Sequence, residues 1–256
     1  MAHKALYRRF RPRRFENLKG QEVVATVLKN QVSAGEPSHA YLFSGPRGTG
    51  KTSTAKILAC ALNCLNPKDG EPCLECENCK AALEDAMIDI IEMDAASNNS
   101  VENARDIRDK AGLLPAKGKY KVYIIDEVHM LTGSAFNALL KTLEEPPAHV
   151  VFILATTELA ALPKTVLSRC QRFDFRRIEE GDIAARLEEV AQNVGVKAQK
   201  SAIMQIAAAS DGALRDALTI LDQCCSFSSE IDEQLVSQVL GYAGYTALYA
   251  LIAAMA

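Results

Sequence analysis

The sequence predicts an α/β protein, in which helices cover both faces of a five-stranded parallel sheet and a smaller helical domain follows. Five short runs have strand character, and one of them, residues 119–127, lacks the alternation of apolar and polar residues that half-exposed strands show, which favours a central strand buried on both faces. Helical patterns separate these runs, as is typical of parallel sheets. After about Ile178 only helical periodicity remains. The strand candidates are residues 40–43, 87–94, 119–127, 150–155 and 171–175.

Length and composition are those of an ordinary globular protein with one or two cores. The chain has 256 residues, 48% of them apolar, and a formal net charge of −3. Domains commonly run to about 100–150 residues, so two are expected. No run approaches the roughly 18 apolar residues of a membrane span, and the basic start lacks the apolar region of a secretion signal. We therefore expect a cytoplasmic protein.

The first twenty residues are strongly basic, with seven Lys or Arg side chains against the single acidic Glu16. Aromatic residues alternate with the arginines between Tyr7 and Phe15. One interpretation is a solvated arm. The other is a segment that folds across a bound nucleotide and covers its base, with Tyr7, Arg11 and Pro12 as contacts. A helix from about Val23 to Val32 follows.

A glycine-rich loop after the first strand candidate matches the pattern G-x-x-x-x-G-K-[ST], and a helical run (53–59) follows it. Glycines at 45, 48 and 50 let the backbone N–H groups point inward, and the helix adds the positive end of its dipole, so the loop can hold a polyphosphate. Lys51 is then expected to reach the β- and γ-phosphates and Thr52 to bind Mg²⁺. The alternative is a glycine-rich turn without a ligand. The residues of the loop are Gly45, Pro46, Arg47, Gly48, Thr49, Gly50, Lys51 and Thr52.

Four cysteines follow the helix of this loop. Three of them are spaced three residues apart, and the fourth precedes them across a turn rich in Pro and Gly, a pattern typical of a tetrahedral Zn²⁺ site with four thiolates. Disulfides or free thiols are the alternative. All four ligand positions are filled by protein, so the expected zinc is structural. These ligands are Cys64, Cys73, Cys76 and Cys79, whereas Cys60, Cys224 and Cys225 are expected in the core.

The third strand candidate, residues 119–127, ends in two acidic residues. At the tip of a central strand, Asp126 is expected beside Mg²⁺ and Glu127 beside the attacking water, which is the second half of a P-loop nucleoside triphosphatase site. The fourth strand delivers Thr157 to the same edge, where ligands of open α/β sheets bind. Thr157 is therefore a candidate contact to the γ-phosphate or to the water, unless it only ends the strand.

Helices complete the sheet domain and build the second one. Residues 101–111, 133–145 and 162–167 are predicted helices. We expect the nucleotide domain to span residues 1–178, a lid of three or four helices to span 179–242, and residues 243–256 to begin a further domain. Arg215 lies near the start of a lid helix; it is either a surface charge or a side chain facing the nucleotide.

Taken together, these segments resemble a known family. Eight segments are similar to the gamma/tau subunits of bacterial DNA polymerase III, the AAA+ ATPases of the clamp loader. They are residues 7–21, residues 45–52, the cysteine insertion, residues 125–131, residues 136–147, Thr156-Thr157, Ser168-Arg169-Cys170 and residues 214–218. The match covers about residues 5–242, and the cysteine insertion is its most specific part.

The resemblance implies roles for individual residues and also implies partners. It makes residues 45–52 Walker A, Asp126 and Glu127 Walker B, Thr157 sensor 1, Arg169 an arginine finger acting on a neighbouring subunit, and Arg215 sensor 2. The implied cofactors are ATP, Mg²⁺ and Zn²⁺. The implied partners are the other subunits of a hetero-pentamer, a sliding clamp and primed DNA. If the protein is the long (tau) form, a polymerase core and a helicase are also implied, bound through regions beyond residue 256.

Two other functions share part of this pattern. A nucleotide-gated scaffold that does not hydrolyse ATP usually lacks the P-loop lysine or the Walker B glutamate, and this chain has Lys51, Glu127 and Arg169. A branch-migration helicase would share the P-loop but has no reason to carry the cysteine insertion. We further expect Arg105 and Lys141 to contact DNA phosphates, although either side chain alone is equally consistent with a solvated helix surface.

Overall fold

The computed structural model describes residues 5–241, which form two compact units. The first, here called the sheet domain, spans residues 12–176. The second, called the helical domain, combines residues 5–11 with residues 177–241. The segment 243–256, expected to begin a further domain, lies outside the described residues.

The sheet domain is built on the predicted parallel sheet. Its strands are β1 (Ala40–Ser44), β2 (Ile90–Asp94), β3 (Lys121–Asp126), β4 (Val150–Thr156) and β5 (Gln171–Asp174), and all their pairings are parallel. The strand order is β2-β3-β4-β1-β5. Asp94 is paired with Asp126 and Ser44 with Thr156, so the carboxyl ends of four strands reach one edge of the sheet. This arrangement confirms the predicted fold class.

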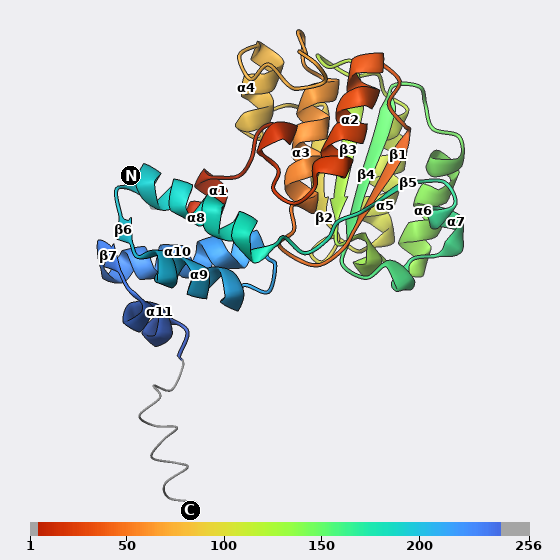
Figure 1. Ribbon diagram of the computed structural model, residues 1–256. Helices are drawn as coiled ribbons and strands as arrows, with labels where there is room; N and C mark the ends of the chain where they lie inside the picture. Colours follow the sequence, from red (N-terminus) through yellow and green to blue (C-terminus); the bar gives the residue numbers. More distant parts are fainter. Residues whose placement is uncertain (1–4, 242–256) are drawn as a thin grey trace, which may run out of the picture. The chain divides into compact units, whose positions relative to one another are not determined.

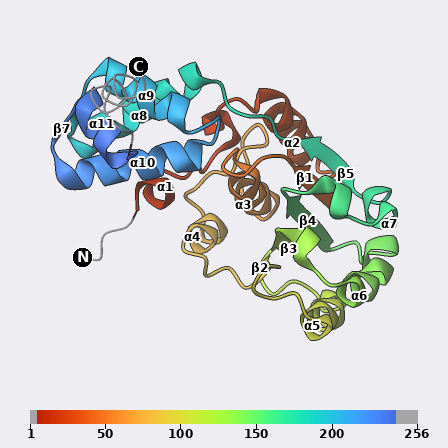
Figure 2. The ribbon, with the colours of Figure 1, turned by 90° about the horizontal axis from the view of Figure 1, so that it is seen from below.

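Helices cover both faces because successive strand residues point to opposite sides (Figures 1 and 2). On one face, α2 (Glu22–Ala34) and α3 (Lys51–Leu62) pack over Tyr41 and Phe43. On the other face, α5 (Val101–Ala111) and α6 (Gly133–Glu144) pack over Leu42. Five shorter elements complete this domain: η1 (Phe15–Asn17), α4 (Glu77–Leu83), η2 (Val128–Met130), η3 (Leu159–Ala161) and α7 (Lys164–Leu167).

Local signals explain several helix ends. The Ser100 hydroxyl accepts from the Asn103 N–H at the start of α5, and Thr132 does the same for Ala135 at the start of α6. Gly35 ends α2 in the left-handed conformation, with φ of 70°. The predicted helix 53–59 is longer in the structure, because α3 already begins at Lys51, directly after Gly50.

The helical domain contains α8 (Glu180–Val194), α9 (Lys200–Ala209), α10 (Leu214–Phe227) and α11 (Glu233–Val239). Two features of this domain differ from the sequence prediction. A short parallel pair, β6 (Lys197–Ala198) with β7 (Glu230–Ile231), interrupts the helical pattern. Such two-residue strands are too short to produce a period in the sequence.

The second difference is the position of the chain start. Residues 5–11, placed with the nucleotide domain by the sequence analysis, form α1 (Leu6–Arg9) and pack in the helical domain. Leu6 is buried in the core of that domain, its N–H donates to the Asp222 carboxylate at 3.2 Å, and Arg186 donates to the Phe10 carbonyl at 3.0 Å. The boundary between the two domains accordingly lies at residues 176 and 177 instead of 178 and 179. Among residues 5–241, no helix combines the length and apolar character that crossing a membrane requires.

Candidate functional site

The glycine-rich loop connects β1 to α3 in a conformation that requires glycine. Gly45, Gly48 and Gly50 have φ of 141°, 79° and 107°, a range that other residues rarely adopt. A Cβ atom on Gly45 would lie 2.3 Å from the Phe175 carbonyl oxygen, so no side chain fits there. The first turn of α3 adds N–H groups without helical partners. Loop and helix together therefore fit a polyphosphate.

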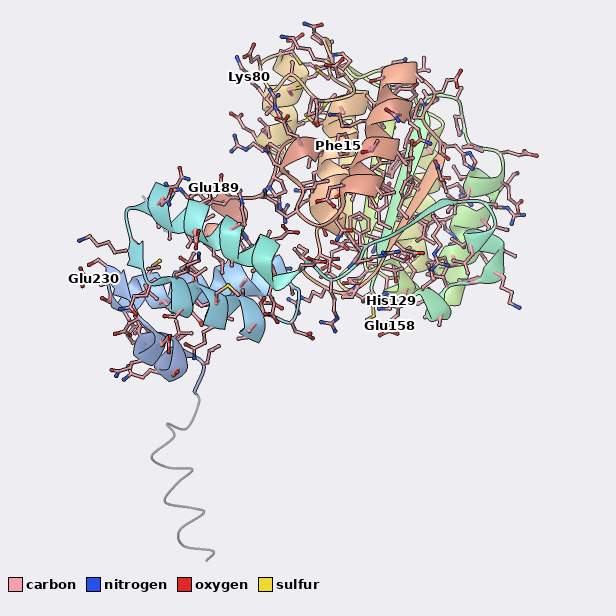
Figure 3. All side chains as sticks on the ribbon, viewed as in Figure 1. Phe15, Lys80, His129, Glu158, Glu189 and Glu230 are labelled. Atoms are coloured by element: carbon pink, nitrogen blue, oxygen red, sulfur yellow. The ribbon has the colours of Figure 1, made fainter. Side chains whose placement is uncertain are left out.

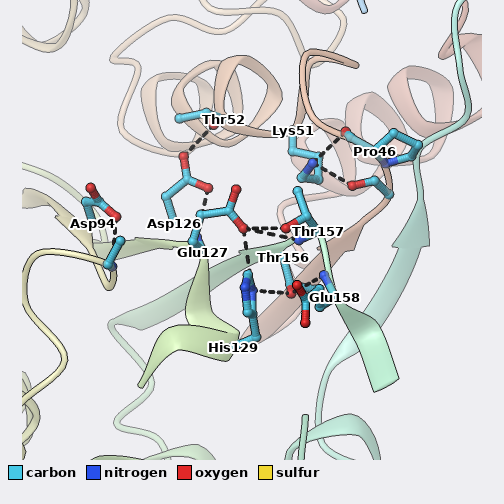
Figure 4. Close-up of polar contacts among 12 residues, drawn as sticks. Pro46, Lys51, Thr52, Asp94, Asp126, Glu127, His129, Thr156, Thr157 and Glu158 are labelled. Atoms are coloured by element: carbon cyan, nitrogen blue, oxygen red, sulfur yellow. Dashed lines mark hydrogen bonds and ion pairs between the residues drawn. The ribbon is translucent and has the colours of Figure 1, made fainter. Parts of the chain in front are cut away.

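Lys51 lies inside this loop. Its side chain is buried, and its ammonium donates to the carbonyls of Gly45 and Pro46, both at 2.7 Å (Figure 4). Burial lowers the pKa of Lys51, while the carboxylates of Glu127 and Asp126 favour its charged form. The ammonium is thus held in the loop that would surround the phosphates.

Thr52 and Asp126 meet at the end of β3. The Thr52 hydroxyl donates to Oδ2 of Asp126 at 2.6 Å, although the two residues lie 74 positions apart. A hydroxyl and a carboxylate are the oxygen ligands that Mg²⁺ takes beside nucleotide phosphates. The pair therefore fits the magnesium ion that the sequence predicts, and a bound ion would supply charge neutralisation at the phosphates.

Glu127 follows in a left-handed backbone conformation, with φ of 47°, which is uncommon for a residue with a side chain. Its Oε2 atom accepts from the N–H and the hydroxyl of Thr157, at 3.2 and 2.9 Å (Figure 4). Nδ1 of His129 lies 3.4 Å from the same oxygen. The structure thus brings Glu127 and Thr157 together, as expected of groups that orient one water molecule.

His129 and Thr156 also lie at this edge of the sheet, and the sequence analysis assigned no role to either. His129 stands in η2 (Val128–Met130), and its Nδ1 lies 3.0 Å from the hydroxyl oxygen of Thr156, the last residue of β4. His129 and Glu158 lie at the same edge of the sheet domain (Figure 3). A signal was present, because His129 comes three residues after Asp126 and Thr156 directly precedes Thr157.

Arg169 lies just after α7 and is held by neighbours outside the P-loop. Its Nη2 forms an ion pair with Glu144 at 2.8 Å, at the end of α6, and its Nη1 donates to the Thr165 carbonyl at 2.6 Å. No hydrogen bond or ion pair links Arg169 to the P-loop among residues 12–176. This position is compatible with action on another molecule, which stays a prediction.

Arg215 and Tyr7 meet each other in the helical domain. The Arg215 guanidinium lies 4.8 Å from the centre of the Tyr7 ring, a cation–π contact. The Tyr7 hydroxyl accepts from Arg8 at 3.1 Å, and this bond is the main cause of a lowered pKa of Tyr7. The domain division falls between Arg11 and Pro12. The base-contacting roles predicted for Tyr7, Arg11 and Pro12, and the sensor role of Arg215, stay predictions.

The four predicted zinc ligands come together in the structure. The sulfur atoms of Cys64, Cys73, Cys76 and Cys79 all lie within 4.8 Å of one another, and those of Cys73 and Cys79 are 3.9 Å apart. Zn–S bonds of about 2.3 Å in a tetrahedron place the sulfur atoms about 3.8 Å apart, so the group fits zinc. It is the one such cluster of His, Cys, Asp or Glu side chains found in the described part of the chain.

Backbone N–H groups also point at the sulfur atoms. The N–H of Cys73 donates to the sulfur of Cys64 at 3.3 Å, and the N–H groups of Cys76 and Cys79 donate to the preceding cysteine of the motif at 3.4 Å. Burial opposes ionisation of the Cys73 thiol, but the N–H groups of Glu75 and Cys76 and the neighbouring thiols lower its pKa to about 6. Burial raises the pKa of Cys64 and of Cys79. A metal would be needed to ionise all four thiols.

Glu71 fastens the cysteine segment to the sheet domain. Its carboxylate is buried and accepts from the N–H groups of Phe15 and Glu16 at 2.8 and 3.0 Å, with the Lys29 ammonium at 3.3 Å. Neighbouring Gly70 has φ of 77°, and a Cβ atom there would lie 2.2 Å from the Lys29 carbonyl oxygen. The cysteine segment is therefore fixed to the domain that carries the P-loop, yet it contributes no side chain to the P-loop contacts described above.

The two predicted DNA contacts lie on neighbouring helices. Arg105 is exposed on α5 and Lys141 is exposed on α6, and these helices pack side by side (Figure 2). Within residues 5–241, neither side chain has a hydrogen bond or an ion pair, so both charges are free to meet another molecule.

Comparison with known proteins identifies related chains. A family model described as "DNA polymerase III, delta subunit" matches residues 20–179, and a model described as "DNA polymerase III clamp loader subunit, ATPase lid domain" matches residues 182–230. DNA polymerase III subunit tau of Bacillus subtilis is 54% identical over 90% of this chain and 41% of its own length. The Escherichia coli subunit tau is 46% identical over 94% of this chain and 38% of its own length.

A shorter relative is matched over more of its length. DNA polymerase III subunit gamma of Buchnera aphidicola subsp. Baizongia pistaciae is 40% identical over 94% of this chain and 65% of its own length. This chain thus spans about two fifths of the tau subunits and about two thirds of this gamma subunit. Among solved structures, the Thermotoga maritima RuvB branch migration motor is similar, with a TM-score of 0.66, 21% identity, and coverage of 90% of this chain and 72% of RuvB. That likeness supports the AAA+ P-loop fold.

Proposed function

Because this chain belongs to the gamma/tau subunit family of DNA polymerase III, we propose that it is an ATP-hydrolysing motor subunit of a clamp loader. In this role the protein uses ATP and Mg²⁺ to place a ring-shaped sliding clamp on primed DNA during replication in the cytoplasm. The observation that carries the proposal is the convergence of Lys51, the Thr52–Asp126 pair and the Glu127–Thr157 pair at one edge of the sheet. Those groups have the chemistry that ATP hydrolysis needs.

The roles within the site follow from the side chains. The N–H groups of the loop and the Lys51 ammonium bind the phosphates, and Thr52 and Asp126 hold Mg²⁺. Glu127 orients the attacking water and accepts its proton. Thr157 can donate its hydroxyl either to Glu127 or to a phosphate oxygen, and so acts as a sensor of the γ-phosphate.

A scaffold that binds ATP without hydrolysing it is the alternative function. It would need neither Glu127 nor a partner that holds the Glu127 carboxylate. In this chain the carboxylate accepts two hydrogen bonds from Thr157, which favours hydrolysis.

Assembly completes the proposed machine. Other clamp-loader subunits form a hetero-pentamer with this chain, and Arg169 acts on ATP bound by a neighbour, where an arginine stabilises charge in the transition state. Arg215 of the lid senses the nucleotide, and Zn²⁺ at the four cysteines is structural. In a long (tau) form of the protein, the polymerase core, itself a nucleotidyltransferase, and the helicase bind through regions beyond residue 256.

The test mixes two inactive variants in reconstituted full-length complexes. Lys51→Ala removes phosphate binding in one set of subunits, and Arg169→Ala removes the finger in the other. Either variant alone should lose clamp- and DNA-stimulated ATP hydrolysis by orders of magnitude, whereas mixtures should regain part of it. Some mixed interfaces then pair an intact P-loop with an intact finger. A mixture that assembles yet stays as inactive as its parents would contradict the trans role.

A further inference from the structure

The Glu127 carboxylate has one crowded oxygen and one open oxygen. Its Oε2 atom accepts two hydrogen bonds from Thr157, and Nδ1 of His129 lies 3.4 Å from the same atom. No hydrogen bond or ion pair involves Oε1 within residues 12–176. Figure 4 shows the carboxylate between Thr157 and His129. Oε1 is therefore the atom that remains for a water molecule.

The two partners of Oε2 differ in what else they do. Under the function proposed above, the Thr157 hydroxyl also donates a hydrogen bond to the γ-phosphate. When that hydroxyl turns to a phosphate, Oε2 loses its shortest hydrogen bond. His129 has no such second task, because its nearest polar neighbours are Glu127 and the Thr156 hydroxyl.

We propose that His129 is a positioning residue that keeps the Glu127 carboxylate in place when Thr157 engages the nucleotide. This inference rests on the proposed ATPase function and adds to it a residue that touches neither the phosphates nor Mg²⁺. The imidazole acts through Nδ1, which lies 3.0 Å from the Thr156 hydroxyl oxygen and 3.4 Å from Oε2. Its N–H donates to Oε2 when Thr157 no longer does.

The surroundings of His129 are rigid enough for this role. The side chain of His129 is 10% exposed, and Thr156, at the end of β4, is fully buried. The Thr156 hydroxyl also accepts from the Glu158 N–H at 3.0 Å, and its carbonyl accepts from the N–H of Gly45 at 3.3 Å. His129 is thus tied to the strand that borders the P-loop.

The backbone on the other side is equally constrained. Glu127 is in the left-handed conformation, and its carbonyl accepts from the Met130 N–H at 2.9 Å, which closes the turn that carries His129. With the backbone fixed, the torsions of the Glu127 side chain are the main freedom left to its carboxylate. A hydrogen bond donated to Oε2 restricts these torsions. The entropy cost of forming it is small, since His129 is already ordered.

Loss of the His129 side chain should lower the turnover of ATP and leave ATP binding nearly unchanged. A reacting group displaced by about 1 Å can lower the rate about 100-fold. We expect His129→Ala to reduce the kcat of ATP hydrolysis by about tenfold to 100-fold, with the KM for ATP and the Kd of a non-hydrolysable ATP analogue changed by less than about threefold.

The experiment compares four histidine variants in the reconstituted full-length complex with clamp and primed DNA. In His129→Asn the amide nitrogen takes the place of Nδ1, and in His129→Gln it takes the place of Nε2. We expect Asn to restore much of the kcat, and Gln and Ala to stay low. His39→Ala is the matched control, because His39 is exposed and its side chain has no hydrogen bond or ion pair within the described chain. It should behave as wild type.

The outcomes separate this inference from the proposed function. If wild-type complexes hydrolyse ATP and Glu127→Gln complexes do not, but His129→Ala matches wild type, the inference is wrong and the proposed function stands. Equal kcat values for the Asn, Gln and Ala variants would also contradict the claim that Nδ1 of His129 donates to Oε2. Absence of hydrolysis by verified wild-type complexes would contradict the proposed function itself. If His129→Ala fails to fold, as judged by its thermal unfolding midpoint, the kcat values of His129→Asn and His129→Gln test the inference; it is wrong if they are equal.

Discussion

Asp89 offers a quantitative test of how the sheet edge is held together. This residue directly precedes β2 and is 1% exposed. Its carboxylate accepts from the N–H groups of Ala116, Lys117 and Gly118, each at 2.7 Å. Those three groups belong to the segment that leads into β3, the strand that ends in the acidic pair. Replacing Asp89 by Asn removes the charge and exchanges one carboxylate oxygen for an NH₂ group; even in the place of Oδ1, where it meets the fewest donors, this group faces the Ala116 N–H and cannot accept from it.

The expected loss of stability follows from that hydrogen bond. Hydrogen bonds to charged groups contribute about 1.5–3 kcal/mol each, so Asp89→Asn should lower the free energy of unfolding by at least about 1.5 kcal/mol. Burial opposes ionisation of Asp89, but the three N–H groups and Lys121 lower its pKa. A carboxyl whose folded-state pKa is lowered stabilises the fold fully above its unfolded pKa, about 3.9, and loses this contribution as the pH falls through the folded value. The penalty should therefore be constant from pH 8 to pH 5 and shrink only below about pH 4.

Urea unfolding measures this penalty. The chain has no tryptophan, so far-UV circular dichroism is the suitable signal. Asp109→Asn is the matched control, because Asp109 is exposed and pairs only with Arg108, at 2.7 Å; its effect should stay within about 0.5 kcal/mol. If Asp89→Asn were no worse than Asp109→Asn, or if its penalty vanished between pH 7 and pH 5, the assigned role of the three hydrogen bonds would be refuted.

Three further predictions concern ligands. Lys51→Ala should abolish ATP binding, while Glu127→Gln should keep binding and lose hydrolysis; equal binding losses, measured with a labelled nucleotide, would contradict this division of roles. One zinc per chain should co-purify with the reduced protein, and Cys76→Ser should lose metal and stability yet bind ATP if soluble, which metal analysis and a binding assay check. Alanine at Arg105 and at Lys141 should each lower the salt slope of primed-DNA binding by about one, and unchanged DNA-stimulated ATPase in the double variant would exclude both contacts.

The sheet was predictable because its strands carry their own signal. A parallel strand buried on both faces must be apolar throughout, and β3 and β4 show this without help from other segments. The position of residues 5–11 was not predictable in this way. Leu6 is a single apolar residue in a basic segment, and its burial depends on helices more than 170 residues away in the chain. A local pattern holds no information about which of two cores such a residue joins.

The residues of the candidate site also differ in whether a local sequence pattern could predict them. Lys51, Thr52 and Asp126 were predicted because fixed motifs place them at strand and helix ends. His129 was missed because its role depends on the pairing of β3 with β4, which brings the turn after Glu127 beside Thr156. A histidine after an acidic pair has many possible neighbours, and only the strand register selects Thr156 among them.

The ion pair between Arg169 and Glu144 leads to the last prediction. A finger that acts on a neighbouring subunit must leave its own surface, so the contact that holds it there has to be weak. The two side chains are 32% and 45% exposed, and ion pairs of that kind contribute at most about 1 kcal/mol. Glu144→Gln should therefore change stimulated ATP hydrolysis by a factor of about five or less, whereas Arg169→Ala should lower it by orders of magnitude. Both variants should bind ATP as wild type does, since neither side chain contacts the P-loop. If Glu144→Gln lowered stimulated ATP hydrolysis as much as Arg169→Ala, the ion pair would be needed in the assembled complex itself. The idea that Glu144 holds Arg169 only until it acts on a neighbouring subunit would then be wrong.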